Sequence, residues 1–81
     1  MMYGYKMLQV RFGKNLHSER ILKNLTQEQL AEISSYSVES ISLFERGINA
    51  PSFRGIERLA KSLELDPAQL FLAPEDKEIG E

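Results

Sequence analysis

The sequence contains no cysteine among its 81 residues. This excludes a disulfide framework and a thiolate metal site. No apolar run approaches the ~20 residues that a membrane-spanning helix needs, and the first residues lack the basic-then-apolar layout of a signal peptide. We therefore expect a single cytoplasmic domain with no membrane contact.

Residues for catalysis or for holding a cofactor are equally scarce. His17 is the only histidine, and no partner cluster for a metal or catalytic role accompanies it. The segment around Gly13 and Lys14 lacks the second glycine and the hydroxyl residue of a phosphate-binding loop. The sequence therefore predicts that the protein is not an enzyme and has no cofactor and no metal site.

Basic residues do not dominate the composition either. Ten Lys and Arg residues stand against twelve Asp and Glu residues, which gives a net charge of -2. That balance argues mildly against nucleic acid as a partner. However, residues 1–25 carry five basic side chains and one acidic one, whereas residues 26–50 carry one basic and four acidic. Because binding depends on one face of a protein, the total charge does not decide the question.

Helical periodicity is what the sequence does contain. Every strong apolar pattern has helical spacing, and no segment alternates with period two for long. Thr26, Ser37 and Asp66 are expected N-caps, and Gly47 ends the third helix because it enters the left-handed region without a Cβ clash. We expect an all-α domain over residues 9–73 with five helices, near residues 8–23, 26–35, 37–46, 51–63 and 66–73. An amino-terminal arm (residues 1–8) and an acidic flexible tail (residues 74–81) flank it.

The second and third predicted helices are short and are joined by the polar turn "SSYS", residues 34–37. Two short capped helices at a tight turn are typical of the helix-turn-helix motif. In that motif the second helix projects from a packed body into the major groove of DNA, which admits one α-helix. The first helix braces it across the phosphate backbone. The pattern therefore indicates double-stranded DNA as a partner.

The segments "LTQEQLAEIS", "ISLFERG" and "IERLAKSLELDPAQLF" occur in this order, and together they resemble the Cro/lambda-repressor-like helix-turn-helix proteins, or XRE family. The likeness covers roughly residues 12–71 and implies a five-helix domain of the lambda-repressor type. It implies a sequence-specific transcriptional regulator that binds a palindromic operator as a homodimer, with half-sites ~34 Å apart. Small proteins of this type resemble phage repressors, controllers of restriction-modification genes and self-regulating antitoxins.

The resemblance also implies roles for single positions. Arg20 and Glu45 occupy positions that form an ion pair in some members and tie the first helix to the third. The residues expected in the dimer interface are Leu65, Leu70, Phe71 and Leu72. The residues expected to contact DNA are Gln27, Ser37, Val38, Glu39, Ser42, Leu43, Arg46 and Asn49.

Several features depart from the family pattern. Ser35 replaces the usual glycine of the turn, so it must adopt an unusual backbone conformation or the turn must differ. Tyr36 must find a partner for its hydroxyl group or keep it in water. The third helix is also poor in basic residues, which leaves two interpretations open.

In the first interpretation, phosphate contacts come from residues outside the third helix and from helix N-termini, and the third helix reads bases. In the second, the motif is a scaffold whose surface binds a protein, such as the toxin partner of an antitoxin. We also expect no small-molecule effector, because few residues follow the fifth predicted helix.

Overall fold

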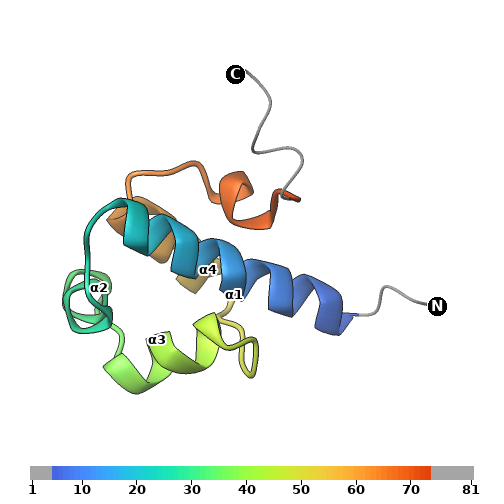
Figure 1. Cartoon of the computed structure of the whole chain (residues 1–81), viewed down its shortest axis with the longest axis horizontal. Helices are drawn as coiled ribbons and strands as arrows, with labels where there is room; N and C mark the ends of the chain where they lie inside the picture. The colour runs from blue at the N-terminus through green and yellow to red at the C-terminus, as the bar shows by residue number, and fades with distance from the viewer. Residues whose placement is uncertain (1–4, 74–81) are drawn as a thin grey trace.

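The computed structural model describes residues 5–73, which form helices and turns without a β-strand. Four α-helices are followed by a short 3-10 helix, and Figure 1 shows the long first helix crossing the molecule with the others packed around it. The elements are α1 (Tyr5–Leu22), α2 (Gln27–Ser34), α3 (Val38–Glu45), α4 (Phe53–Ser62) and η1 (Pro67–Phe71). The all-α prediction is thus confirmed.

The fifth element differs from the prediction, because residues 67–71 form a 3-10 helix rather than an α-helix. Asp66 caps it and Pro67 stands at its start, as expected. The side-chain amide of Asn15, buried in α1, donates to the carbonyl oxygens of Leu70 and Leu72, each at 3.0 Å. These bonds satisfy carbonyl groups that a longer helix would pair internally, so the segment can end after one short turn.

The boundaries of the domain also shift. Helix α1 begins at Tyr5, so residues 5–8 of the predicted arm belong to the helix. The first four residues of that arm and the predicted acidic tail, residues 74–81, lie outside the described residues.

Side-chain caps begin the internal helices where the sequence places them. The Gln29 backbone N–H donates to Thr26 Oγ1 at 3.0 Å, and the Gln29 side chain accepts from the Thr26 N–H at 2.8 Å. This reciprocal capping box satisfies two N–H groups that the helix cannot pair internally. Ser37 and Ser52 cap α3 and α4 in the same sense through their hydroxyl groups.

A single core joins all five elements. Its fully buried apolar side chains come from all five elements and from the residue that follows α4: Phe12, Leu16, Leu30, Ile41, Leu59, Leu63 and Leu70. The exposed fraction of Leu70 is 0%, so this residue cannot meet a second subunit and the prediction that places it in a dimer interface is wrong. Its apolar character reflects the packing of η1 against α1.

Helix α1 approaches the end of α3 unusually closely at Gly13. A Cβ atom at this position would overlap the carbonyl oxygen of Phe44 and lie 2.9 Å from that of Glu45. The two backbones can therefore meet only because residue 13 has no side chain. Although glycine weakens a helix interior by about 1 kcal/mol relative to alanine, here it sets the distance between α1 and α3.

We expect Gly13→Ala to lower the free energy of unfolding by about 1–3 kcal/mol, although alanine favours the helix. The clash involves backbone atoms of another element, which cannot rotate away. Urea unfolding followed by circular dichroism would measure the change. Ser18→Ala, at an exposed position of the same helix, is the control and should be neutral or slightly stabilising. An increase in stability for Gly13→Ala would show that the α1–α3 contact is loose.

Candidate nucleic-acid interface

Helix α3 lies along one edge of the molecule, with its inner side against the core and its outer side open (Figure 1). Ile41 and Phe44 are buried. Val38 and Glu39 are exposed near the start of the helix, and Ser42 and Leu43 are half-buried farther along. The helix therefore presents a mixed apolar, acidic and hydroxyl surface to solvent.

The turn before α3 has a left-handed residue at its centre. Ser35 has φ of 65° and ψ of 27°, which is the left-handed conformation. This is the unusual backbone conformation expected of a serine that stands where the family has glycine. The following N–H, that of Tyr36, donates to the carbonyl oxygen of Ala31 at 3.0 Å and closes the end of α2. A non-glycine residue in this region is strained, so the turn is maintained by the packing around it.

Tyr36 supplies that packing. Its ring meets Phe44 edge-on, with centroids 5.1 Å apart, and the guanidinium carbon of Arg58 lies 4.3 Å from its centroid. Gly55 of α4 makes room, because a Cβ there would overlap the Tyr36 hydroxyl. The turn is thereby fixed against α4. Arg58 and Gly55 are absent from the predicted site, since no sequence pattern reveals contacts across about twenty residues.

A pair of serines shapes the N-terminal end of α3. Ser37 Oγ accepts from the Ser40 N–H and donates to Ser40 Oγ, both at 3.0 Å. As the N-cap of α3, the Ser37 hydroxyl group thus acts both as a hydrogen-bond acceptor and as a donor. Ser40 carries the hydroxyl proton that this pair leaves free, although it is not among the residues predicted to contact DNA.

Gln27, expected to contact phosphate or a base edge, is half-buried at the start of α2 and turned inward. Its side-chain amide donates to Glu45 Oε1 at 3.0 Å. The residue therefore connects the first turn of α2 to the last residue of α3. This contact orients the Gln27 side chain and leaves the other amide hydrogen and the carbonyl oxygen for an external partner.

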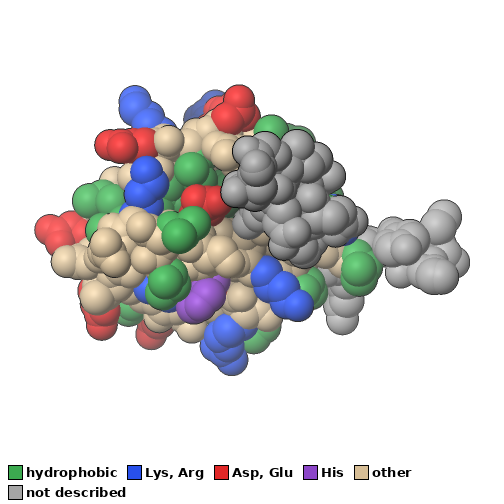
Figure 2. Space-filling view, turned by 45° about the horizontal axis from the view of Figure 1, so that its top comes forward, with side chains coloured by type: hydrophobic (Ala, Val, Ile, Leu, Met, Phe, Trp, Pro, Cys, Tyr) green, Lys and Arg blue, Asp and Glu red, His purple; other side chains and the backbone are tan. Residues whose placement is uncertain are grey.

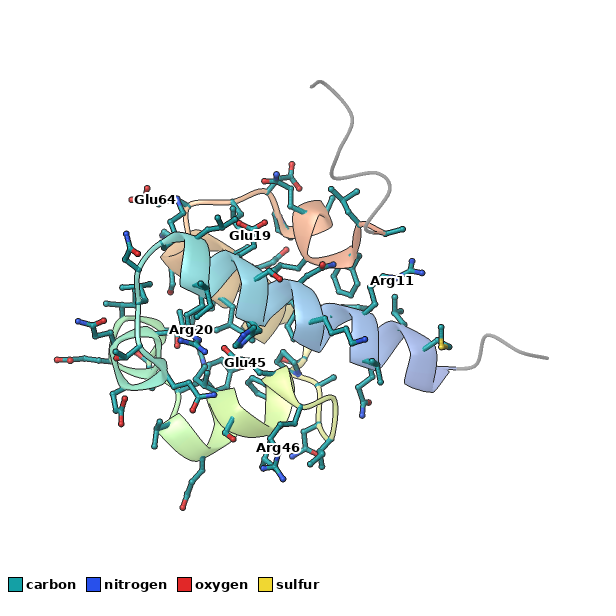
Figure 3. The ribbon with its side chains drawn as sticks, viewed as in Figure 1. Arg11, Glu19, Arg20, Glu45, Arg46 and Glu64 are labelled. Carbon is teal, nitrogen blue, oxygen red and sulfur yellow. The ribbon has the colours of Figure 1, made fainter. Side chains whose placement is uncertain are left out.

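Arg20 and Glu45 face each other between α1 and α3 (Figure 3), as the expected ion pair requires. Arg20 Nε donates to Glu45 Oε2 at 2.6 Å, and Nη2 donates to Oε1 at 3.1 Å. The remaining nitrogen, Nη1, donates to the carbonyl oxygen of Leu25 at 2.8 Å. The two side chains are only 9% and 5% exposed. One guanidinium thus joins α1, the loop before α2 and the end of α3.

The environment of Glu45 favours its charged form. Burial raises the pKa of Glu45, but hydrogen bonds from Arg20, Gln27 and His17 outweigh that effect and leave the pKa below its ordinary value of 4.5. His17 Nδ1 lies 3.1 Å from Glu45 Oε1. Because Glu45 is at the C-terminal, negative end of the α3 dipole, a facing cation is needed to hold it there.

Arg46 and Asn49 follow α3 and are both exposed. Figure 3 shows Arg46 at the end of α3, extending away from the body of the protein. On the face drawn in Figure 2, basic side chains lie among acidic and apolar ones rather than in one continuous belt. The candidate interface thus has an exposed cation at the C-terminal end of α3.

These features define a helix-turn-helix protein, and the chain belongs to the helix-turn-helix family of the Cro/lambda-repressor (XRE) type, which matches residues 16–70. It is similar to the restriction-modification controller protein C.AhdI from Aeromonas hydrophila, with 33% identity and a TM-score of 0.80 over 85% of this chain and 100% of that one.

Two further solved structures are similar. A hypothetical transcription factor, NHTF, from Neisseria has 27% identity and a TM-score of 0.82 over 86% of this chain and 79% of that one. The clp gene regulator ClgR from C. glutamicum has 30% identity and a TM-score of 0.77 over 79% and 82%. Among curated proteins, no sequence match is found. None of the helices within residues 5–73 has the length and apolar character to cross a membrane.

We expect the stabilising effect of Glu45 to depend on pH. Because its pKa is lower in the folded protein than in the unfolded chain, its contribution is complete above about pH 4.5 and is lost as the pH falls through the folded-state value. The difference in unfolding free energy between the wild type and Glu45→Gln should therefore shrink from pH 7 to pH 3. Urea titrations across that range would measure it.

Glu32→Gln, at an exposed position of α2, is the matched control and should differ little from the wild type at every pH. A difference for Glu45→Gln that stays constant with pH would mean that the ion pair is not formed in solution.

Proposed function

We propose that this protein is a sequence-specific DNA-binding transcriptional regulator that reads its operator with α3. The observation that carries the proposal is the open outer face of α3 on a braced helix-turn-helix. Glu39 is exposed, while the inner residues Ile41 and Phe44 are buried. An α-helix exposed in this way fits the major groove, where each base pair presents a distinct pattern of donors and acceptors.

The chemistry of this face indicates how bases would be read. The Glu39 carboxylate can accept a hydrogen bond from the cytosine amino group, and Val38 can contact a thymine methyl group. Ser42 can donate to or accept from a base, and Leu43 adds apolar surface beside it. Ser40 joins this set because its hydroxyl proton is free.

Affinity for the phosphate backbone has to come from the ends of the motif. Arg46 and Asn49 are exposed beyond the C-terminal end of α3. Gln27 stands at the start of α2, where the helix dipole favours a negative group such as phosphate. With so few basic groups, binding should release few counterions and depend only moderately on salt.

Homodimerisation on a palindromic operator completes the proposal. One small reading surface supplies too few contacts for tight specific binding. Two copies related by a two-fold axis would place two α3 helices in successive major grooves, about 34 Å apart. Such a dimer would also bury apolar surface on a domain that is small for independent stability.

A protein partner is the competing proposal, and one feature favours it. Helix α2 carries exposed Glu28, Glu32 and the apolar Ile33 on its surface. An acidic surface with an apolar centre suits a basic partner protein, such as the toxin partner of an antitoxin. Under this proposal the helix-turn-helix would retain its shape without reading DNA.

Selection of bound duplexes from a random pool, followed by gel-shift titration with salt, separates the two proposals. Enrichment of one palindromic sequence supports the regulator. Absence of enrichment, with DNA binding that is weak or indifferent to sequence, contradicts it and favours the protein partner.

We expect Glu39→Ala to change base preference at one position of each half-site by about 1–3 kcal/mol. The carboxylate is the most polar group on the open face of α3, and its removal leaves the fold intact because the side chain is exposed. Competition gel shifts with operators varied at single positions would measure the change. An unchanged preference at every position would remove Glu39 from the reading surface.

Arg46→Ala should weaken binding to all sequences alike and reduce the slope of log affinity against log salt by about 1 per subunit. Its side chain extends away from the body, at the end of α3 (Figure 3). Lys61→Ala, on an exposed part of α4, is a charge-matched control and should leave the slope unchanged. A selective effect of Arg46→Ala on certain sequences would indicate a base contact instead.

A further inference from the structure

Three nitrogen atoms converge on one carboxylate oxygen, Oε1 of Glu45. They are Arg20 Nη2 at 3.1 Å, Gln27 Nε2 at 3.0 Å and His17 Nδ1 at 3.1 Å. A carboxylate oxygen offers about two lone pairs to hydrogen-bond donors. Because three neighbours share about two acceptor sites, the three cannot all donate equally well at the same time.

The part that His17 takes in this cluster depends on its protons. Its Nδ1 also lies 3.2 Å from Arg20 Nη2. When a neutral ring carries its proton on Nε2, Nδ1 accepts from Arg20 and donates nothing to Glu45. When the ring is protonated, both nitrogens carry protons, so Nδ1 can only donate, and Glu45 Oε1 is the acceptor beside it. The side chain is 54% exposed, so it can exchange this proton with water.

Gln27 is the neighbour that is most easily displaced from Glu45. Arg20 is held by two further bonds, from Nε to Glu45 Oε2 at 2.6 Å and from Nη1 to the carbonyl oxygen of Leu25 at 2.8 Å. Gln27 is half-buried, and within residues 5–73 its side chain donates only to Glu45. A bond from a charged imidazolium to a carboxylate is about twice as strong as one between neutral groups. A protonated His17 should therefore replace the Gln27 amide.

The charges around His17 leave it as the group that can change. An imidazole ordinarily changes its charge between pH 5 and 8. Glu45 on α3 stays ionised in that range because its pKa lies below 4.5, and the guanidinium of Arg20 on α1 stays charged. Helix α2 contributes the uncharged Gln27. Other charged residues next to this cluster in the chain are exposed and, within residues 5–73, form no ion pair with His17: Lys14, Glu28 and Arg46.

We propose that His17 is a positioning residue of the candidate interface, whose protonated ring takes the place of Gln27 on Glu45 and frees the Gln27 amide. The consequence for DNA rests on the proposed function. A freed Gln27 side chain can turn outward and offer both of its amide hydrogens to a phosphate at the start of α2, where the helix dipole favours an anion. DNA binding then strengthens as the pH falls through the range in which an imidazole gains its proton.

Two-dimensional NMR of the full chain without DNA tests the displacement itself. We expect the side-chain amide signals of Gln27 to shift between about pH 7.5 and 5.5, with the same midpoint as the signals of the His17 ring. In His17→Gln they should stay constant. Gln29 is the internal control, because its side chain belongs to the capping box of α2 and its amide signals should not titrate.

Far-UV circular dichroism at both pH values establishes that the helices remain intact. Gln27 signals that do not titrate in the wild type, or that titrate equally in His17→Gln, overturn the inference.

Gel-shift titrations on the selected operator at the two pH values and one ionic strength measure the consequence for binding. We expect the wild type to bind about threefold to tenfold more tightly at the lower pH, the effect of one hydrogen bond. His17→Gln and Gln27→Ala should each lose this gain. Ser18→His combined with His17→Gln is the matched control, since position 18 is exposed. It restores an imidazole to the same turn but on another side of the helix, so the gain should stay absent.

The outcomes with and without DNA separate the two proposals. A wild type whose Gln27 signals titrate with His17, but that enriches no DNA sequence, rejects the proposed function and leaves the His17 contact intact. A wild type that selects a DNA site but binds it no more tightly at the lower pH rejects the role of His17 in binding alone. A gain that survives Gln27→Ala, or that returns in the double variant, reflects added positive charge in general and rejects that role as well.

Discussion

The ion pair between Arg20 and Glu45 is the contact on which the geometry of the helix-turn-helix depends. Its two side chains are nearly inaccessible to solvent, so each charge requires the other. Removing one partner of a buried pair typically costs about 3–5 kcal/mol, because the remaining charge loses its compensation. The guanidinium also donates to the carbonyl oxygen of Leu25. A single side chain therefore sets the relative positions of α1, the start of α2 and the end of α3.

The same region contains a second constraint of a different kind. Gly13 lets the backbone of α1 reach the carbonyl oxygens of Phe44 and Glu45. Electrostatic attraction fixes the direction of the Glu45 side chain, and steric contact fixes the distance between helices. Because α3 has no basic residue in its last turn, Arg20 from α1 also neutralises the negative end of its dipole. Both constraints act at the C-terminal end of α3, while the packing of Tyr36 against α4 fixes its beginning.

Much of this fold follows from the sequence because its signals are local. The caps at Thr26, Ser37 and Asp66 and the left-handed conformation of Gly47 depend on neighbouring residues alone, and the structure contains all of them. The last element also has a distant partner, since Asn15 donates to the carbonyl oxygen of Leu70 in η1 and to that of Leu72, which follows it. Local periodicity predicts a helix there but cannot distinguish the 3-10 form.

The candidate site divides in the same way. The exposure of Val38 and Glu39 follows from their spacing relative to the buried Ile41 and Phe44. The inward turn of Gln27 could not be predicted, because it depends on where α3 ends in space. Leu70 is a core residue. A sequence alone does not show whether an apolar residue in a short helix faces the core or a partner. Only burial distinguishes the two roles.

The scarcity of basic residues on α3 is consistent with how the motif is built. A basic reading helix would gain affinity for all DNA alike, because phosphate contacts carry no sequence information. Helix α3 instead offers a carboxylate, hydroxyl groups and apolar side chains, which favour some base edges and are repelled or unsatisfied by others. Under the proposed function, such a surface would discriminate between base sequences but bind weakly as a single copy. Its affinity would then come from two copies acting together on one operator.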